Sequence, residues 1–177
     1  MSDLIQSSSS LDTLSAEPHA VKFLQFQLYP SIKVMLGITQ ITEVLKLKSG
    51  QIVPIPQMPS WVMGVYNWRG DILWMIDLGE LLGLDSWHQY RLNLAAQTAI
   101  VLSPNRQQAN DIHLGLVVAQ VDDLEMCNPN AIQSSLSSQM SPRLESFLQG
   151  YWLKPDGEMI LALDPQAIAA AMPSGDE

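Results

Sequence analysis

The hydrophobic and polar positions of this chain follow a pattern that occurs twice. Residues 61–77 (WVMGVYNWRGDILWMID) contain an apolar segment, a polar turn with glycine, a second apolar segment and an Asp. Residues 147–164 (FLQGYWLKPDGEMILALD) repeat this order with one residue inserted at the turn, and each copy precedes a short segment of helical pattern, at residues 78–84 and 165–172. Repetition of one unit in the same order predicts two similar subdomains that pack together.

A second, weaker repeat precedes each copy. Residues 38–44 (ITQITEV) resemble residues 118–124 (VAQVDDL). In the first of these segments the apolar residues have the spacing i, i+3, i+4, which predicts a short helix or helical turn over residues 39–45. The acidic segment that begins at Asp122 is expected to form an irregular or briefly helical, solvated connection as far as Ser141.

The other apolar segments are short and are separated by turn residues. They predict a hairpin over residues 21–38, which turns at Tyr29-Pro30-Ser31, and further strands over residues 99–102 and 112–121. Short strands with tight turns and few long helices indicate a mainly β chain built from two small, five-stranded barrels with short helices.

The domain boundaries follow from composition. Residues 1–20 contain a run of four serines with Asp, Thr, Glu and Pro, which predicts a disordered leader. Residues 21–172 are expected to form the ordered domain, divided into subdomains at roughly 21–90 and 91–172, and residues 173–177 a tail.

Charge and length exclude several classes of function. The chain has 177 residues, 47% of them hydrophobic, and a net charge of −9. A nucleic-acid binder or an anionic-membrane binder needs a basic surface, so neither partner is expected. The sequence shows no apolar segment of roughly 18 residues and no signal peptide, so we expect no membrane insertion and a cytoplasmic location. The single cysteine, Cys127, is expected to be a buried, unreactive thiol.

Catalytic chemistry is not indicated by the residue pattern. The histidines at 19, 88 and 113 do not have the spacing of metal ligands, and the glycines stand at isolated turn positions rather than in a phosphate-binding loop. The acidic residues near Asp122 lack the alternation and the glycine of a calcium loop. We therefore expect no enzyme activity, no metal and no cofactor.

Surface recognition is the better-supported chemistry. Of the five tryptophans, Trp61, Trp74 and Trp152 are expected in the core. Trp68 stands beside Arg69 at the predicted hairpin turn, where exposure is expected, and these two residue types dominate interface energies.

Three segments of the chain resemble the motifs of a known protein family. The segment GVYNWRG at residues 64–70, followed by an apolar strand and Asp77-Leu78, resembles the motif G-V-x-N-L-R-G, apolar run, D-L of the CheW family, the adaptors of bacterial chemosensory arrays. Residues 41–44 (ITEV) and residues 115–121 (GLVVAQV) resemble two further family segments. The resemblance extends from residue 21 to about residue 172.

The resemblance implies a fold and two partners. The family fold is a pair of packed, SH3-like β-barrels, of which one face binds the regulatory domain of a CheA-type histidine kinase. A surface near the junction of the barrels binds the cytoplasmic tip of a methyl-accepting chemoreceptor. The positions that match the family motif are Glu43, Asn67, Arg69 and Gly70, and with Trp68 they are the predicted partner-binding residues.

Three departures from the family pattern affect the subtype. Trp68 replaces the usual leucine, Gln120 replaces a common aspartate, and the leader is longer and rich in serine. They favour a variant adaptor of PilI type, from a pilus-dependent motility or phototaxis system. An SH3-like protein-interaction module in another pathway stays open as the alternative.

Overall fold

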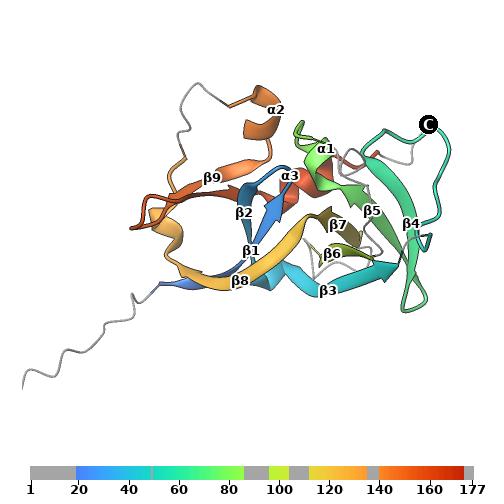
Figure 1. Ribbon diagram of the computed structural model, residues 1–177, viewed down its shortest axis with the longest axis horizontal. Helices are drawn as coiled ribbons and strands as arrows, with labels where there is room; N and C mark the ends of the chain where they lie inside the picture. Colours follow the sequence, from blue (N-terminus) through green and yellow to red (C-terminus); the bar gives the residue numbers. More distant parts are fainter. Residues whose placement is uncertain (1–18, 49, 86–95, 104–111, 135–139, 174–177) are drawn as a thin grey trace, which may run out of the picture.

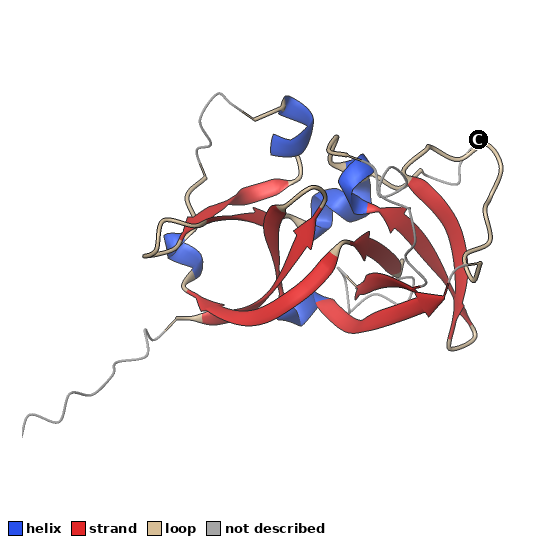
Figure 2. Cartoon of the chain, viewed as in Figure 1, coloured by secondary structure: helices blue, strands red, loops and turns tan. Residues whose placement is uncertain are grey.

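The computed structural model describes residues 19–48, 50–85, 96–103, 112–134 and 140–173. Nearly all of the predicted leader and tail, together with Trp87 and His88, lies outside the described residues. Within the described residues the chain is mainly β, as expected, with short helical segments between the strands (Figures 1 and 2).

The described part of the chain contains ten strands, which form two sheets of five strands each. Sheet A has the order β8-β1-β2-β10-β9 and consists of Gln120–Cys127, Val21–Leu28, Ile32–Gly37, Met159–Leu163 and Leu148–Leu153. Sheet B has the order β3-β6-β7-β5-β4 and consists of Ile41–Lys48, Ala96–Leu102, Leu114–Val118, Asp71–Asp77 and Val62–Trp68. The two sheets lie side by side in Figure 1, with α1 (Leu78–Leu81) and α3 (Pro165–Ala170) between them. The other helical segments within the described ranges are η1 (Ile38–Gln40), η3 (Pro129–Ala131) and α2 (Pro142–Glu145).

The duplicated unit predicted from the sequence is present, but the two copies exchange strands. In each copy a first hairpin is followed by three more strands: β1 and β2 precede β3 to β5, and β6 and β7 precede β8 to β10. The hairpin β1–β2 pairs with β8 and β10, and the hairpin β6–β7 pairs with β3 and β5. Each sheet therefore combines the hairpin of one copy with the last three strands of the other.

This exchange corrects the predicted subdomain boundary near residue 90. Sheet A takes strands from both ends of the chain, and sheet B takes strands from the middle. A local pattern reveals where strands begin and end, but pairing is decided by contacts between segments far apart in sequence, so the contiguous division was wrong.

Three apolar clusters hold the fold together. The largest lies between the sheets and includes Phe26, Leu36, Ile76 and Ile100, each completely buried. The second cluster is formed by side chains from the strands of sheet B. The third is formed by side chains from the strands of sheet A, among them Phe23 and Met35. Strands buried on both sides explain the near-continuous apolar runs of β6 and β7, where simple alternation is missing.

The two copies of the sequence repeat adopt the same local structure. Gly64 in β4 and Gly150 in β9 both have positive φ, of 135° and 155°. Each lies against the backbone of an extended segment, where Val53 bridges to Val65 and Gln133 bridges to Tyr151.

The aspartates that end the two copies also have one role. The Asp77 carboxylate accepts a hydrogen bond from the Glu80 amide and begins α1, and the Asp164 carboxylate accepts bonds from the amides of Gln166 and Ala167 and begins α3. The second apolar segment of each copy therefore ends in a helix cap.

Three predicted elements differ from the structure. The single strand expected over residues 112–121 is divided between β7, which ends at Val118 in sheet B, and β8, which begins at Gln120 in sheet A. Residues 39–45 were expected to form a helical turn, but the 3-10 turn covers only Ile38–Gln40 and is followed by the strand β3. A connection was expected over residues 122–141, but its first six residues lie in the strand β8, and only the described part after Cys127, which includes η3, is irregular or briefly helical. Both β3 and β8 are edge strands, and most of their residues are exposed or half-buried. Their sequences therefore mix polar and apolar residues as a turn or a loop does, which explains the wrong predictions.

Candidate partner-binding site

The candidate site is built on the turn between β4 and β5. Trp68 pairs with Asp71, so Arg69 and Gly70 form a two-residue loop. Both loop residues have positive φ, 55° for Arg69 and 91° for Gly70, which is the geometry of a type I′ turn. The Asn67 side-chain oxygen accepts a hydrogen bond of 3.1 Å from the Gly70 amide. Asn67 and Gly70 therefore have a structural role, since they hold the turn that presents Arg69.

Glu43 of β3 joins the turn from the opposite edge of sheet B. One carboxylate oxygen accepts a hydrogen bond from the indole N–H of Trp68. The other lies 2.5 Å from a guanidinium nitrogen of Arg69, whose side chain is 66% exposed. The guanidinium carbon also lies 5.2 Å from the centre of the Trp68 ring. The structure thus brings together all five predicted site residues.

The predicted exposure of Trp68 is wrong. Trp68 is only 8% exposed and packs in the sheet B cluster with Leu73 and Met75. Trp68 is the last residue of β4, and its side chain packs in the apolar cluster formed by sheet B. The turn begins only at the next residue, Arg69. The other described tryptophans, Trp61, Trp74 and Trp152, are half-buried at the margins of the apolar clusters.

A polar network, which was not predicted from the sequence, lies behind this site. The Ser103 hydroxyl lies 2.7 Å from Nδ1 of His113 and 3.0 Å from the Thr42 hydroxyl, and the His113 ring meets the Trp68 ring edge-on at 5.1 Å. A serine–histidine contact resembles the nucleophile and base of a catalytic triad. However, Ser103 is only 3% exposed, and its hydroxyl also forms a hydrogen bond with the Thr42 hydroxyl. The network therefore supports the back of the Trp68 ring. No local spacing joins Thr42, Ser103 and His113 in the sequence.

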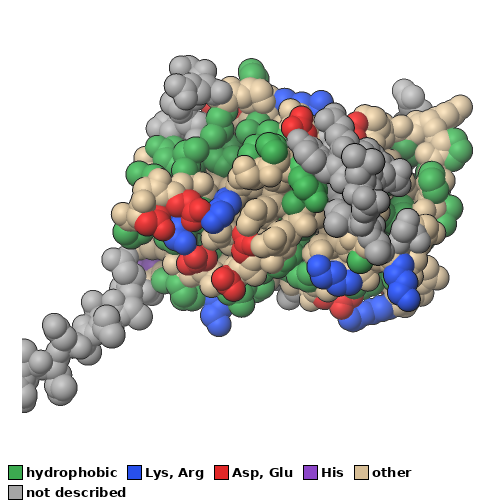
Figure 3. Space-filling view, in the orientation of Figure 1, with side chains coloured by type: hydrophobic (Ala, Val, Ile, Leu, Met, Phe, Trp, Pro, Cys, Tyr) green, Lys and Arg blue, Asp and Glu red, His purple; other side chains and the backbone are tan. Residues whose placement is uncertain are grey.

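In sheet A the position that corresponds to Trp68 carries Lys154. Its ammonium lies 2.7 Å from the Glu125 carboxylate and 3.8 Å from that of Glu158. The hydrogen bond that Lys154 donates to the Glu125 carboxylate raises the pKa of Lys154, and partial desolvation acts in the opposite direction. Lys33 pairs with Glu158 at 2.5 Å. The two copies therefore join their edge strands by different chemistry, an aromatic anchor in sheet B and an ion-pair network in sheet A, where Figure 3 shows acidic and basic side chains interleaved.

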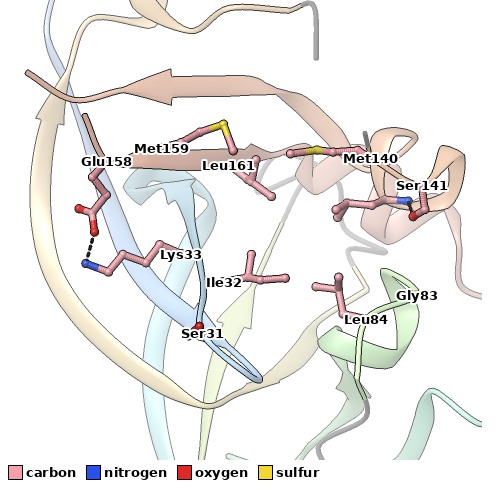
Figure 4. Close-up of a pocket in the computed structure, with 11 residues that line it drawn as sticks. Ser31, Ile32, Lys33, Gly83, Leu84, Met140, Ser141, Glu158, Met159 and Leu161 are labelled. Carbon is pink, nitrogen blue, oxygen red and sulfur yellow. Dashed lines mark hydrogen bonds and ion pairs between the residues drawn. The ribbon is translucent and has the colours of Figure 1, made fainter. Parts of the chain in front are cut away.

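A groove lies at the junction of the two sheets. It has a volume of about 620 Å³ and is walled mainly by apolar side chains from β2, β10, the end of α1 and the region of α2. In Figure 4, Met140, Met159 and Leu161 face Ile32 and Leu84 across the groove, and the Lys33–Glu158 ion pair lies at one end. An apolar groove with a charged rim has the chemistry to accept an amphipathic helix.

The described residues offer little other chemistry. No helix in the described ranges is long and apolar enough to cross a membrane. They contain no group of three or more histidine, cysteine or acidic side chains that could hold a metal ion. Cys127 is buried, as predicted, and its burial raises the pKa of the thiol, which disfavours the reactive thiolate.

Comparison with known families gives the fold and the site a context. The model of the CheW-like domain matches residues 22–172, which is most of the chain. The chain belongs to the CheW-like domain family. Among solved structures, it is similar to the scaffolding protein TtCheW from Thermoanaerobacter tengcongensis, with 26% sequence identity and a TM-score of 0.65 over 82% of this chain and 89% of that one. No curated protein shows significant sequence similarity to the chain. Membership of the CheW-like family supports a role as a chemotaxis scaffold or adaptor.

Proposed function

We propose that this protein is a non-enzymatic chemosensory adaptor that couples a chemoreceptor to a CheA-type histidine kinase. The observation that carries the proposal is the pair formed by Glu43 and Arg69, which is held at the surface by a type I′ turn and a buried tryptophan. A surface ion pair contributes little to folding, so this much local organisation is better explained by recognition than by stability.

The turn is suited to recognition because its geometry is fixed before a partner arrives. Arg69 adopts a positive φ, a conformation that non-glycine residues seldom adopt and that is concentrated at functional sites. A preordered Arg loses less conformational entropy when it binds, and Arg is among the residues that dominate interface energies. The partner in this proposal presents an acceptor group that takes over part of the Arg69 interaction with Glu43.

The second partner contact in this proposal is the groove at the junction of the sheets. A chemoreceptor tip is helical, and the apolar walls formed by Ile32, Leu84 and Met159 would cover the apolar face of such a helix. By holding receptor and kinase together in the cytoplasm, the adaptor would let a receptor change bias the kinase equilibrium.

The test is affinity purification of the full-length, tagged protein from its native cells, with partners identified by mass spectrometry. Arg69→Ala is compared with the wild type and with Lys22→Ala, which removes an exposed cation from sheet A. We expect a CheA-like kinase and a methyl-accepting receptor to copurify with the wild type and Lys22→Ala, and to be depleted with Arg69→Ala. Copurification of other proteins alone would overturn the adaptor function and favour an interaction module of another pathway. A variant that binds normally, or that melts much earlier, would overturn the role of Arg69.

A further inference from the structure

A polar pocket lies on sheet A, next to the apolar groove. It has a volume of about 480 Å³ and is formed by side chains from β1, β2, β8 and the turn between β9 and β10. Its lining shares with the groove only Lys33 and Glu158, whose ion pair lies at one end of the groove in Figure 4. It shares no residue with the Glu43–Arg69 site. Most of its side chains therefore have no part in the two contacts of the proposed adaptor function.

One lining residue, Gln25, stands where sheet B has an apolar side chain. Strand β8 has a β-bulge with one extra residue, so Asp122 and Asp123 both lie opposite Gln25 of β1. The same irregularity in β3 leaves Glu43 opposite Val101, which is completely buried in the sheet B cluster. The repeated unit therefore carries a polar side chain in sheet A at a position that is apolar in sheet B.

The side-chain amide of Gln25 is buried but faces the pocket without a partner. Gln25 is only 5% exposed and lies on the same face of β1 as Phe23, since side chains two residues apart in a strand point the same way. Its amide has no hydrogen-bond partner among the described residues. Within the same residues, the one unpartnered side-chain atom that is closed off from solvent belongs to Gln97, so the Gln25 amide keeps access to the pocket that it lines. Buried polar groups are nearly always hydrogen-bonded, so an occupant with N–H donors would complete this one.

The charges of the pocket favour a cation as its occupant. The lining contains four carboxylates and two ammonium groups, an excess of two negative charges. Both ammonium groups are already paired, because Lys33 lies 2.5 Å from the Glu158 carboxylate and Lys154 lies 2.7 Å from that of Glu125. The lysines of the pocket therefore leave two carboxylates without a cation.

These two carboxylates belong to the bulge in β8. Within the described ranges, no cation lies at ion-pair distance from Asp122 or Asp123. The Asp122 carboxylate accepts hydrogen bonds from the neutral side-chain amides of Gln27 and Gln120. By contrast Glu43, which the sequence repeat aligns with Asp123, is paired with an arginine. The position that receives a cation from the chain itself in sheet B is open to one from outside in sheet A.

From the unpartnered amide and the two free carboxylates we infer that this pocket binds an organic cation with a primary ammonium group. The Gln25 amide oxygen and the carboxylates of Asp122 and Asp123 are three acceptor groups, and an ammonium has three N–H donors. The described residues contain no group of acidic, histidine or cysteine side chains that could hold a metal ion, so the cation brings N–H donors instead. The volume of the pocket lies within the range of small-ligand sites, roughly 300–1,000 Å³.

The test measures binding of small amines to the full-length protein by isothermal titration calorimetry at low ionic strength. The probe is n-butylammonium, with 1-butanol as its neutral analogue and tetramethylammonium as a cation that has no N–H group. We expect n-butylammonium to bind at least tenfold more tightly than tetramethylammonium, and 1-butanol to give no binding. No binding of the amine at millimolar concentration, or equal binding of the two cations, would overturn the inference.

A second probe, the blocked peptide acetyl-Gly-Lys-Gly-amide, distinguishes the two sources of an ammonium group. Binding as tight as that of n-butylammonium would identify the ligand as a lysine side chain of a partner protein. Binding at least tenfold weaker would identify it as a free amine. Neither result depends on the capture of a receptor or a kinase, so failure of this inference and failure of the adaptor function can be told apart.

Four variants assign the contacts. Asp123→Asn and Gln25→Met should each weaken n-butylammonium binding at least fivefold without lowering the melting temperature, because they remove an unpaired charge and an unpartnered amide. The matched controls are Glu145→Gln, which removes an exposed carboxylate of α2, and Gln97→Met, which replaces the buried glutamine of β6; both should bind like the wild type. Asp123 is exposed, so its variant decides the test even if Gln25→Met is unstable. Wild-type binding by Asp123→Asn, or an equal loss in Glu145→Gln, would show that the inference is wrong.

Discussion

The indole N–H of Trp68 donates a hydrogen bond to Oε1 of Glu43, and this bond joins the two edge strands of sheet B, β4 and β3. The same carboxylate meets the exposed Arg69 with its other oxygen. A buried anchor therefore fixes the orientation of a surface charge pair. Leucine, the usual residue of the family motif at this position, has no N–H to make the bond.

Trp68→Phe tests whether the indole bond matters beyond the volume of the ring. Phenylalanine keeps most of the packing but leaves Glu43 Oε1 without its donor, so we expect the free energy of unfolding to fall by about 1–3 kcal/mol. Partner capture should fall as well, because Glu43 and Arg69 lose their shared anchor. Urea denaturation and the copurification assay are the measurements.

Arg69→Ala is the control for Trp68→Phe. It removes the exposed partner of Glu43, and an exposed ion pair is worth about 0–1 kcal/mol, so its stability should stay near that of the wild type. The prediction is wrong if Trp68→Phe is as stable as Arg69→Ala and still captures partners normally.

Gly64 and Gly150 lie at corresponding places in the two copies, and neither tolerates a side chain. A Cβ at Gly64 would lie 2.1 Å from the Val53 carbonyl oxygen, and one at Gly150 would lie 2.2 Å from the Gln133 oxygen. Both residues also have positive φ. We expect Gly64→Ala and Gly150→Ala each to lower the free energy of unfolding by about 2–4 kcal/mol, from backbone strain and overpacking together.

Gly157→Ala separates the two causes. Gly157 has a φ of 87°, but a Cβ there would meet nothing within 4 Å, so the variant should show the strain alone, about 1–2 kcal/mol. Thermal and urea unfolding of the three variants give the comparison. Equal losses in all three would show that close contact with the neighbouring backbone is not the deciding factor.

Much of the fold could be predicted from local pattern. The hairpin over residues 21–38, the two repeats and the helices after Asp77 and Asp164 are all specified by residues close in sequence, through turn chemistry and helix capping. The exchange of hairpins between the copies could not be predicted this way, since both the exchanged and the contiguous arrangement satisfy the same local pattern.

In the candidate site, too, local features could be predicted from the sequence, and features that depend on distant segments could not. The turn at Asn67–Gly70 and the place of Arg69 in that turn follow from residues close in sequence. Glu43 could be named only from its match to the family motif. The burial of Trp68 depends on the interior of sheet B, to which Val101 and Val117 come from the other copy.

Arg143 of α2 connects the two halves of the fold at the groove. Its Nε donates to the Leu81 carbonyl at 2.8 Å, and a terminal nitrogen donates to the Glu80 carbonyl at 3.1 Å, so it caps the end of α1. Hydrogen bonds from a charged donor contribute about 1.5–3 kcal/mol, less at an exposed site, so Arg143→Ala should cost about 1 kcal/mol.

The control for this cap is Arg143→Lys, which keeps the charge but cannot reproduce both bonds of the planar guanidinium. We expect it to recover less than half of the loss seen with Arg143→Ala. Urea denaturation gives the stabilities, and amide hydrogen exchange of α1 shows whether the effect is local. Full recovery by lysine would mean that charge alone, and not the two directed bonds, stabilises the end of α1.

The ion-pair network of sheet A predicts a pH dependence. The pKa of Lys154 is raised, chiefly by its hydrogen bond with Glu125, and that of Lys33 by its bond with Glu158. A raised pKa means that the folded state binds the proton more tightly than the unfolded state, so this stability is fully present below the ordinary lysine pKa of about 10.4 and is lost as pH rises through the folded-state value. Melting temperatures from pH 8 to 12 should therefore fall less steeply above pH 10 in Lys154→Met than in the wild type. Lys22→Met, which removes an exposed cation elsewhere on sheet A, should keep the wild-type slope; an identical slope in Lys154→Met would show that the network does not set the alkaline limit.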